Sequence, residues 1–162
     1  MKKLILLFVL CTSGLLCSTT SAQVTFRVNI GSQPIWGPVG YDHVEYYYLP
    51  EIEAYYYVPS RQFIFMENGR WLTRSSLPAR YRNFDMYNAR KVVVNEPKPY
   101  LHHNDYKVKY VSSNVHSNQQ AIRDSRDSRY FVNKNHPQYN SWKNSQKNQN
   151  SQKNHKNQKG RK

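Results

Sequence analysis

The chain has 162 residues, with 24 Lys and Arg against 10 Asp and Glu, and two cysteines, at positions 11 and 17. Both cysteines lie in a segment that we expect to be removed, so the remaining chain would have no disulfide, cysteine nucleophile or thiolate metal site. The formal net charge of +14 points instead to anionic partners.

Residues 1–22 have the pattern of an export signal. Lys2 and Lys3 precede an apolar run over 4–10, and small residues lead up to a predicted cleavage site after Ala22. The apolar run is short for a transmembrane helix, although an uncleaved anchor is the alternative. A leucine precedes each cysteine, where bacterial lipidation requires a small residue. We therefore expect a periplasmic or secreted protein without a lipid anchor.

Composition divides the rest of the chain into two parts. Residues 23–110 contain 11 Lys and Arg against 8 Asp and Glu, together with 12 of the 14 tyrosines. Residues 111–162 contain 11 Lys and Arg against 2 Asp and Glu. Only the first part has enough apolar residues for a core, and a module of that size has marginal stability on its own. A homodimer is therefore an open possibility.

The first part begins with two segments of different character. Residues 24–30 alternate apolar and polar side chains, as a half-buried strand does, and either join the sheet or form a loose arm. Residues 31–40 contain prolines and glycines around Trp36, which predicts a loop with its tryptophan at the edge of the core.

Two tyrosine triplets predict the next two strands. Tyr46–Tyr48 and Tyr55–Tyr57 are each followed by an apolar residue and then a proline. Tyrosine favours a pleated surface, whereas Pro50 and Pro59 cannot donate to a sheet ladder and should end the strands. Because side chains alternate along a strand, the outer tyrosines of each triplet share a face and the central one takes the other.

Asn68-Gly69 predicts a two-residue hairpin loop, because both residues tolerate the positive φ that such a turn requires. This loop fixes the register of the flanking strands. It places four pairs opposite each other: Glu67 with Arg70, Met66 with Trp71, Phe65 with Leu72, and Ile64 with Thr73. Both faces of this hairpin are apolar, so each needs a cover.

The remainder of the first part contributes smaller elements. Residues 79–87 carry Tyr81, Phe84 and Tyr87 near helical spacing, which predicts a short helix or turns over one sheet face. Residues 91–95 predict the last strand, ended by Pro97 and Pro99, and 102–110 predict at most a weak strand. The expected fold is mainly β: a small antiparallel meander of four to six strands with a short helical turn and a disordered C-terminal tail.

The order of these motifs resembles a group of small, uncharacterised secreted proteins of Gram-negative bacterial envelopes. The likeness spans about residues 41–110. It rests on the segments YYYLPEIEAYYYVP, FIFMENGRW and SLP, on Val92-Val93-Val94, and on the Pro97-Lys98-Pro99-Tyr100 that follows. It implies an envelope location and a compact β-rich module. It brings no catalytic residue and no cofactor.

Residues 111–162 are rich in Asn, Gln, Ser and Lys, and Asn-Ser-Gln-Lys-Asn occurs at both 144–148 and 150–154. Such a composition predicts disorder, with a transient helix at 117–130 anchored by Ile122. From 133 to 162 there are eight Lys and Arg and no acidic residue. Candidate polyanion contacts are Lys143, Lys147, Lys153, Lys156, Lys159, Arg161 and Lys162. The alternative is a tail that only increases solubility.

The first part offers other candidate sites. The outer tyrosines and the hairpin tryptophan could form an aromatic platform for a glycan or peptide: Tyr46, Tyr48, Tyr55, Tyr57 and Trp71. Their alternative role is core packing. Glu51 and Glu53 could act as a carboxylate pair on a glycan, but both lie in a predicted turn. His102 and His103 are adjacent and would point apart on a strand, so a metal site would need His43 or a second copy.

These observations lead to three functional hypotheses. The first is an exported, non-catalytic binding or structural protein whose basic tail associates with lipopolysaccharide, peptidoglycan or acidic glycans, with nucleic acid an unsuitable partner after export. The second is an enzyme or recognition module for glycans that uses the tyrosine-rich sheet. The third is a holdase-type chaperone. The first is the leading hypothesis, and it requires no cofactor.

Overall fold

A computed structural model describes residues 28–110 and 118–159, so the predicted signal segment lies outside the described residues. The fold combines one antiparallel sheet with helices, and the expectation of a mainly β protein is therefore corrected to a mixed α and β protein. The strands are β1 (Tyr46–Leu49), β2 (Ala54–Tyr57), β3 (Gln62–Glu67), β4 (Arg70–Arg74) and β5 (Val92–Val94). The helices are α2 (His103–Tyr110) and α3 (Tyr139–Lys159).

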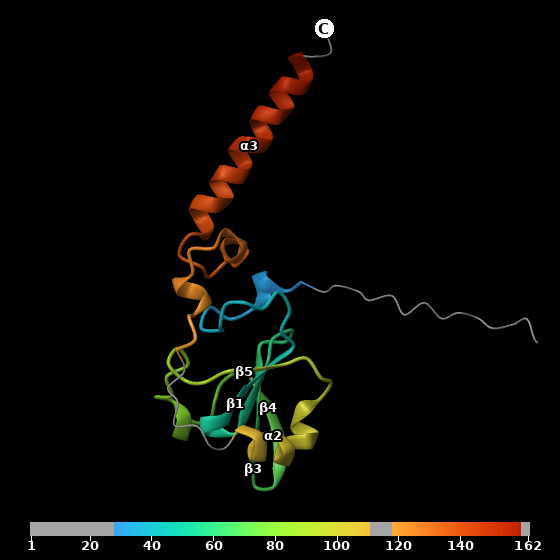
Figure 1. The fold of residues 1–162 in the computed structure, drawn as a ribbon, viewed down its shortest axis with the longest axis vertical. Coiled ribbons are helices and arrows are strands. Elements are labelled where there is room, and N and C mark those ends of the chain that lie inside the picture. The colour runs from blue at the N-terminus through green and yellow to red at the C-terminus, as the bar shows by residue number, and fades with distance from the viewer. Residues whose placement is uncertain (1–27, 111–117, 160–162) are drawn as a thin grey trace, which may run out of the picture.

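The sheet has the strand order β4-β3-β2-β1-β5 (Figure 1). The first four strands form the predicted meander, and the chain then returns to place β5 beside β1. Pro50 follows β1 directly and opens a 3-10 turn, η2 (Pro50–Ile52). Pro59 lies just beyond β2. Both prolines therefore end strands as predicted, because neither can extend a ladder.

The hairpin between β3 and β4 has the predicted register, with Met66 opposite Trp71 and Phe65 opposite Leu72. Asn68 and Gly69 have φ angles of 51° and 72°, so both adopt the left-handed conformation of the two-residue turn. Local turn chemistry is enough to set this register.

One sheet face, which we call the α2 face, is lined by the outer tyrosines of both triplets. Tyr46, Tyr48 and Tyr55 are buried there with Ile64 and Val94. The covering residues come from the 3-10 turn η4 (Pro99–His102), from α2 and from β4, and include Tyr100, Tyr106, Tyr110 and Trp71. On this face a second layer of aromatic rings, from the covering residues, therefore packs on the layer formed by the strand tyrosines.

The opposite sheet face, which we call the loop face, is covered by two irregular segments. At one end Trp36 packs on Tyr47 and Tyr56, with ring centres 5.4 and 5.0 Å apart, as expected for a tryptophan at the core edge. At the other end Tyr81 and Phe84 pack on the cluster around Leu49 and Phe65, together with Leu77 and Met86. The segment 79–87 thus caps the face as predicted, with only one 3-10 turn, η3 (Ala79–Tyr81).

Residues 102–110 are helical, so the prediction of a weak strand was wrong. Tyr106, Val108 and Tyr110 alternate, which suggested a strand, but Tyr106 and Tyr110 are also one helical turn apart. In α2 both rings lie near Tyr48, at 5.9 and 6.2 Å between ring centres, whereas Val108 is 82% exposed. Packing on the sheet selects the helical period over the alternating one.

The expected strand at 24–30 is not formed by its described residues, because Ile30 begins a 3-10 turn, η1 (Ile30–Ser32), and residues 24–27 lie outside the described chain. The Asn29 side chain instead forms hydrogen bonds with both backbone groups of Val44. Its Oδ1 accepts from the Val44 N–H at 2.9 Å, and its Nδ2 donates to the Val44 carbonyl at 2.7 Å.

The predicted disorder does not hold for residues 118–136, which fold against the loop at 30–42. Ile122 and Tyr130 are buried with Ile30. The Ile122 N–H donates to the Gly37 carbonyl at 2.8 Å, and the Gly40 N–H donates to the Tyr130 hydroxyl at 2.6 Å. Two short 3-10 turns, η5 (Ile122–Asp124) and η6 (Ser128–Val132), replace the predicted transient helix.

Helix α3 extends away from the rest of the protein (Figure 1). It is polar on every side, which explains why its composition suggested disorder. Among the described residues, no helix has both the length and the apolar composition needed to cross a membrane.

Candidate functional site

The five residues of the predicted aromatic platform share the α2 face. Tyr46 stacks on Tyr57 with ring centres 4.6 Å apart, and Tyr48 lies 4.8 Å from Tyr55. Trp71 meets Tyr55 edge-on at 5.9 Å. Alternation along the strands brings these side chains together as predicted. Tyr46, Tyr48 and Tyr55 are buried, however, so their rings form core and only the rims of this face are open.

Helix α2 is held over this face by charged and polar contacts to Glu53. Lys107 Nζ lies 2.7 Å from Glu53 Oε1, and His103 Nε2 lies 3.5 Å from Glu53 Oε2. The lysine contact, followed by the histidine, lowers the pKa of the Glu53 carboxyl. The other ring nitrogen of His103, Nδ1, lies 3.2 Å from the Tyr55 hydroxyl. A ligand reaches the buried tyrosines only if these contacts break.

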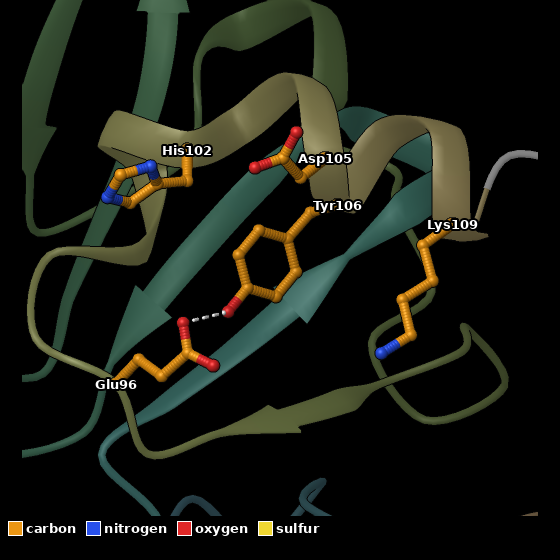
Figure 2. Close-up of a pocket in the computed structure, with 5 residues that line it drawn as sticks. All are labelled: Glu96, His102, Asp105, Tyr106 and Lys109. Atoms are coloured by element: carbon orange, nitrogen blue, oxygen red, sulfur yellow. Dashed lines mark hydrogen bonds between the residues drawn. The ribbon is translucent and has the colours of Figure 1, made fainter.

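A hollow of about 400 Å³ lies beside α2, between the helix and Glu96. Figure 2 shows its lining: Glu96 follows β5, and the other residues come from η4 and α2, namely His102, Asp105, Tyr106 and Lys109. Tyr106 points from the helix towards Glu96, and its hydroxyl donates to Glu96 Oε2 at 2.9 Å. The hollow therefore combines carboxylates, a cation and an aromatic ring.

The protonation state of Tyr106 limits the chemistry of this hollow. Burial, with the hydrogen bond to Glu96, raises the Tyr106 pKa to about 12. The phenol stays protonated at neutral pH and serves as a donor rather than as a base. The hollow is suited to holding small polar or charged groups, and it has no nucleophile activated by a neighbouring base.

The two candidate glutamates are separated by their environments. Glu53 is engaged by α2, whereas Glu51 accepts a hydrogen bond from the Arg90 N–H at 2.8 Å through its Oε1. Glu53 has a φ of 49° and caps the η2 turn in the left-handed conformation. Both glutamates thus connect the β1–β2 turn to neighbouring segments, which is a structural role.

The adjacent histidines also diverge. His103 faces the sheet, whereas His102 is exposed and lines the hollow. In the part of the chain that the structure describes, no three His, Cys, Asp or Glu side chains gather closely enough to hold a metal ion.

The candidate polyanion contacts lie on α3 and beyond it. Lys143 and Lys147 are exposed, one helical turn apart, and the helix contains no Asp or Glu. Lys153, Lys156 and Lys159 belong to the same helix, whereas Arg161 and Lys162 lie outside the described residues.

Sequence reasoning missed the hollow because residues 102–110 were predicted as a weak strand, whereas the hollow forms when this segment is helical and Tyr106 reaches Glu96. The spacing of Tyr106 and Tyr110 was the available signal for the helix.

Comparisons of this chain with protein-family models, with curated proteins and with solved structures found no match.

Proposed function

We propose that this is an exported, non-catalytic protein of the bacterial envelope that associates through α3 with anionic polymers. Lipopolysaccharide, peptidoglycan and acidic glycans are the candidate partners. The folded sheet is the body that α3 tethers to them. The export signal expected at 1–22 and the resemblance to small envelope proteins support the location.

The observation that carries this proposal is the charge of α3. Its 21 residues contain five lysines and no acidic residue. The side chains from Lys143 to Ser151 are all exposed, so no face of this stretch is used for packing. The helix also extends away from the body (Figure 1), which leaves its sides accessible to a polymer.

The physical basis is electrostatic attraction between a row of cations and a row of anions. Each exposed ion pair contributes little, about 0.2–1 kcal/mol, but several act together on one polymer. Such binding weakens as salt screens the charges, since the Debye length falls to about 8 Å at physiological ionic strength.

The experiment compares two charge-neutralising variants of the chain that starts at Gln23. One carries Lys143→Gln, Lys147→Gln and Lys153→Gln. The matched control loses three cations of the body through Arg61→Gln, Arg82→Gln and Lys98→Gln, all at exposed positions. Binding to purified lipopolysaccharide is measured at low and at physiological salt.

We expect the α3 variant to bind about tenfold more weakly at low salt, from three ion pairs of about 0.5 kcal/mol each, and the control to bind nearly as well as the parent. Equal losses in both variants would show that net charge alone attracts the polymer. That result, or no binding by the parent chain, would overturn the proposal.

A further inference from the structure

Within the described residues, strand β4 forms an edge of the sheet and pairs with β3 alone. In a hairpin with a two-residue loop, the residues next to the loop form a hydrogen-bonded pair and the pairs then alternate. Arg70, Leu72 and Arg74 therefore use their backbone groups on β3. The N–H and C=O groups of Trp71 and Thr73 point away from the sheet.

These outward groups are available to another strand. Among the described residues, neither Trp71 nor Thr73 makes a backbone hydrogen bond outside the sheet ladder. The Thr73 carbonyl accepts from Arg74 Nη1 at 3.2 Å, which is an exposed contact that an incoming strand can replace. An unpaired edge of this kind is a template for strand addition.

A second copy of β4 is disfavoured at this edge in the register centred on Leu72. In that register the outward groups of both copies pair, with Trp71 opposite Thr73 and Leu72 opposite Leu72. The same register places Arg70 opposite Arg74 twice. Like charges directly opposite each other destabilise a sheet, so the charge pattern of β4 acts against pairing with itself in this symmetric register.

The same pattern selects an acidic partner. Arg70 and Arg74 are exposed and flank the partly buried Leu72 on the loop face. Consider an antiparallel strand with an apolar residue opposite Leu72. The residues two positions before and after it lie opposite the two arginines, so Asp or Glu at these positions would place a carboxylate opposite each arginine. The partner pattern is acidic-x-apolar-x-acidic.

The other side of this edge offers room for the intervening side chains. A groove of about 380 Å³ lies next to Trp71, lined among others by Met66, Tyr100 and Leu101. Met66 is 40% exposed and Leu101 is 63% exposed, so apolar side chains remain open beside the edge. The partner residue opposite Trp71 would lie at the rim of this groove.

We propose that the β4 edge binds an extended acidic segment of another protein by antiparallel strand addition, with the pattern acidic-x-apolar-x-acidic. This interaction is independent of α3 and of its polymer. It uses backbone hydrogen bonds for alignment and the two arginines for selection.

The probe is the capped peptide Thr-Glu-Thr-Val-Thr-Glu-Thr, titrated at up to millimolar concentration into the ¹⁵N-labelled chain that starts at Gln23. In the proposed register its valine faces Leu72. We expect the amide signals of Trp71 and Thr73 to shift most. No shift at these amides would overturn the proposal, and so would signals that change with protein concentration alone, since they would indicate a second copy at this edge.

Two matched N-methylated peptides separate strand addition from simple charge attraction. Methylation of the threonine that follows the valine blocks a donor facing β4, whereas methylation of the valine itself blocks a donor facing away. We expect at least a tenfold loss of affinity for the first peptide and little change for the second. Equal binding of both would rule out strand addition and leave only a charge contact.

A charge exchange tests the role of the arginines. The variant Arg70→Glu with Arg74→Glu should lose the acidic peptide and gain the peptide in which both glutamates are replaced by lysine. If the variant still prefers the acidic peptide, the arginines do not select the partner and the proposal fails.

Discussion

Gln119 pairs with Lys91 as a residue of a neighbouring strand would. The Lys91 N–H donates to Gln119 Oε1 at 3.0 Å, and Gln119 Nε2 donates to the Lys91 carbonyl at 2.8 Å. The amide side chain thus satisfies both backbone groups of the residue that precedes β5. It also connects the segment that begins at 118 to the sheet.

Replacing this amide should therefore destabilise the fold. We expect Gln119→Leu to lower the free energy of unfolding by about 2 kcal/mol, because two partly buried backbone groups lose their partner. Urea denaturation measures the change. Gln120→Leu is the control, since Gln120 is exposed and its Nε2 donates to the Asp124 carbonyl at 3.2 Å, within its own turn. Equal effects of the two substitutions would contradict the strand-like role of Gln119.

The junction between residues 30–42 and 118–136 depends on Ile122, whose side chain is fully buried. Ile122→Ala should cost about 2–4 kcal/mol through lost burial and the cavity left behind. Hydrogen exchange is the suitable measurement, because the Val39 N–H donates to the Gln120 carbonyl at 3.0 Å across this junction. We expect the protection of this amide to fall by about thirtyfold or more.

Val132→Ala is the matched control, since Val132 is 41% exposed. It should leave the exchange of the Val39 amide nearly unchanged. If Ile122→Ala also leaves that amide protected, the junction is held by other contacts.

The close approach of Gly37 to Tyr47 provides a test of the loop face. A Cβ at position 37 would lie 2.7 Å from the Tyr47 hydroxyl and 3.0 Å from the Pro34 carbonyl oxygen. Tyr47 is fully buried and its hydroxyl donates to Gln33 Oε1 at 3.1 Å, so it has little freedom to move. We expect Gly37→Ala to cost about 1–3 kcal/mol in thermal or urea unfolding.

Gly31→Ala is the comparison for this substitution, because a Cβ at position 31 meets its nearest neighbour at 3.8 Å. It should change stability by less than about 0.5 kcal/mol. A smaller effect at position 37 than at position 31 would mean that the Trp36 loop is not packed on Tyr47 as described.

The buried tyrosines should make the protein sensitive to alkaline pH. Burial raises the pKa of Tyr48 to about 12, and it also raises the pKa values of Tyr47 and Tyr55. Above pH 10 these phenols ionise in the unfolded chain but stay protonated in the folded one, so the unfolded state binds fewer protons. Each such group lowers the free energy of unfolding by about 1.4 kcal/mol per pH unit in this window.

One group acts in the opposite sense. The Lys91 side chain is buried and donates to the carbonyls of Met86 and Tyr87 at 3.1 and 2.9 Å, and desolvation lowers its pKa below 10.5. Between the lowered pKa of Lys91 in the folded state and its ordinary pKa in the unfolded state, this lysine increases the free energy of unfolding as the pH rises. Several tyrosines outweigh it above pH 10, so we expect a net loss.

Tyrosinate absorbance and circular dichroism, followed together, check this prediction. Part of the tyrosine signal should appear late and coincide with loss of structure. The chain in concentrated urea should show a single transition near the ordinary tyrosine pKa of about 10. Titration of all 14 tyrosines near pH 10 with the fold intact would contradict the burial of the α2 face.

The strands and the hairpin register could be predicted from the sequence because they follow local rules. The positive φ angles at Asn68 and Gly69 and the prolines after the tyrosine triplets act within a few residues. The grouping of Tyr46, Tyr48 and Tyr55 on one face follows from alternation alone.

The remaining features depend on contacts between distant segments. The pattern at 103–110 alone fits either a strand or a helix. The packing of Tyr106 and Tyr110 on Tyr48 decides in favour of the helix. The segment at 118–136 is anchored by a few polar contacts, such as Asn133 Nδ2 donating to the Gln33 carbonyl at 2.6 Å. Average composition hides such contacts, so it suggested disorder. The hollow beside Glu96 was missed because it depends on α2, a segment that the sequence analysis predicted as a weak strand.

The three tryptophans of the chain divide among three regions of the molecule. Trp71 lies 5.6 Å from Tyr100 under η4, Trp36 packs on Tyr56 of the loop face, and Trp142 lies in α3, 6.2 Å from Tyr139. Each region therefore carries its own intrinsic fluorophore, excited by energy transfer from nearby tyrosines. Variants that keep one tryptophan at a time would give three separate optical signals. They would report the opening of α2, the release of the loop at 30–42 and the binding of a polymer to α3.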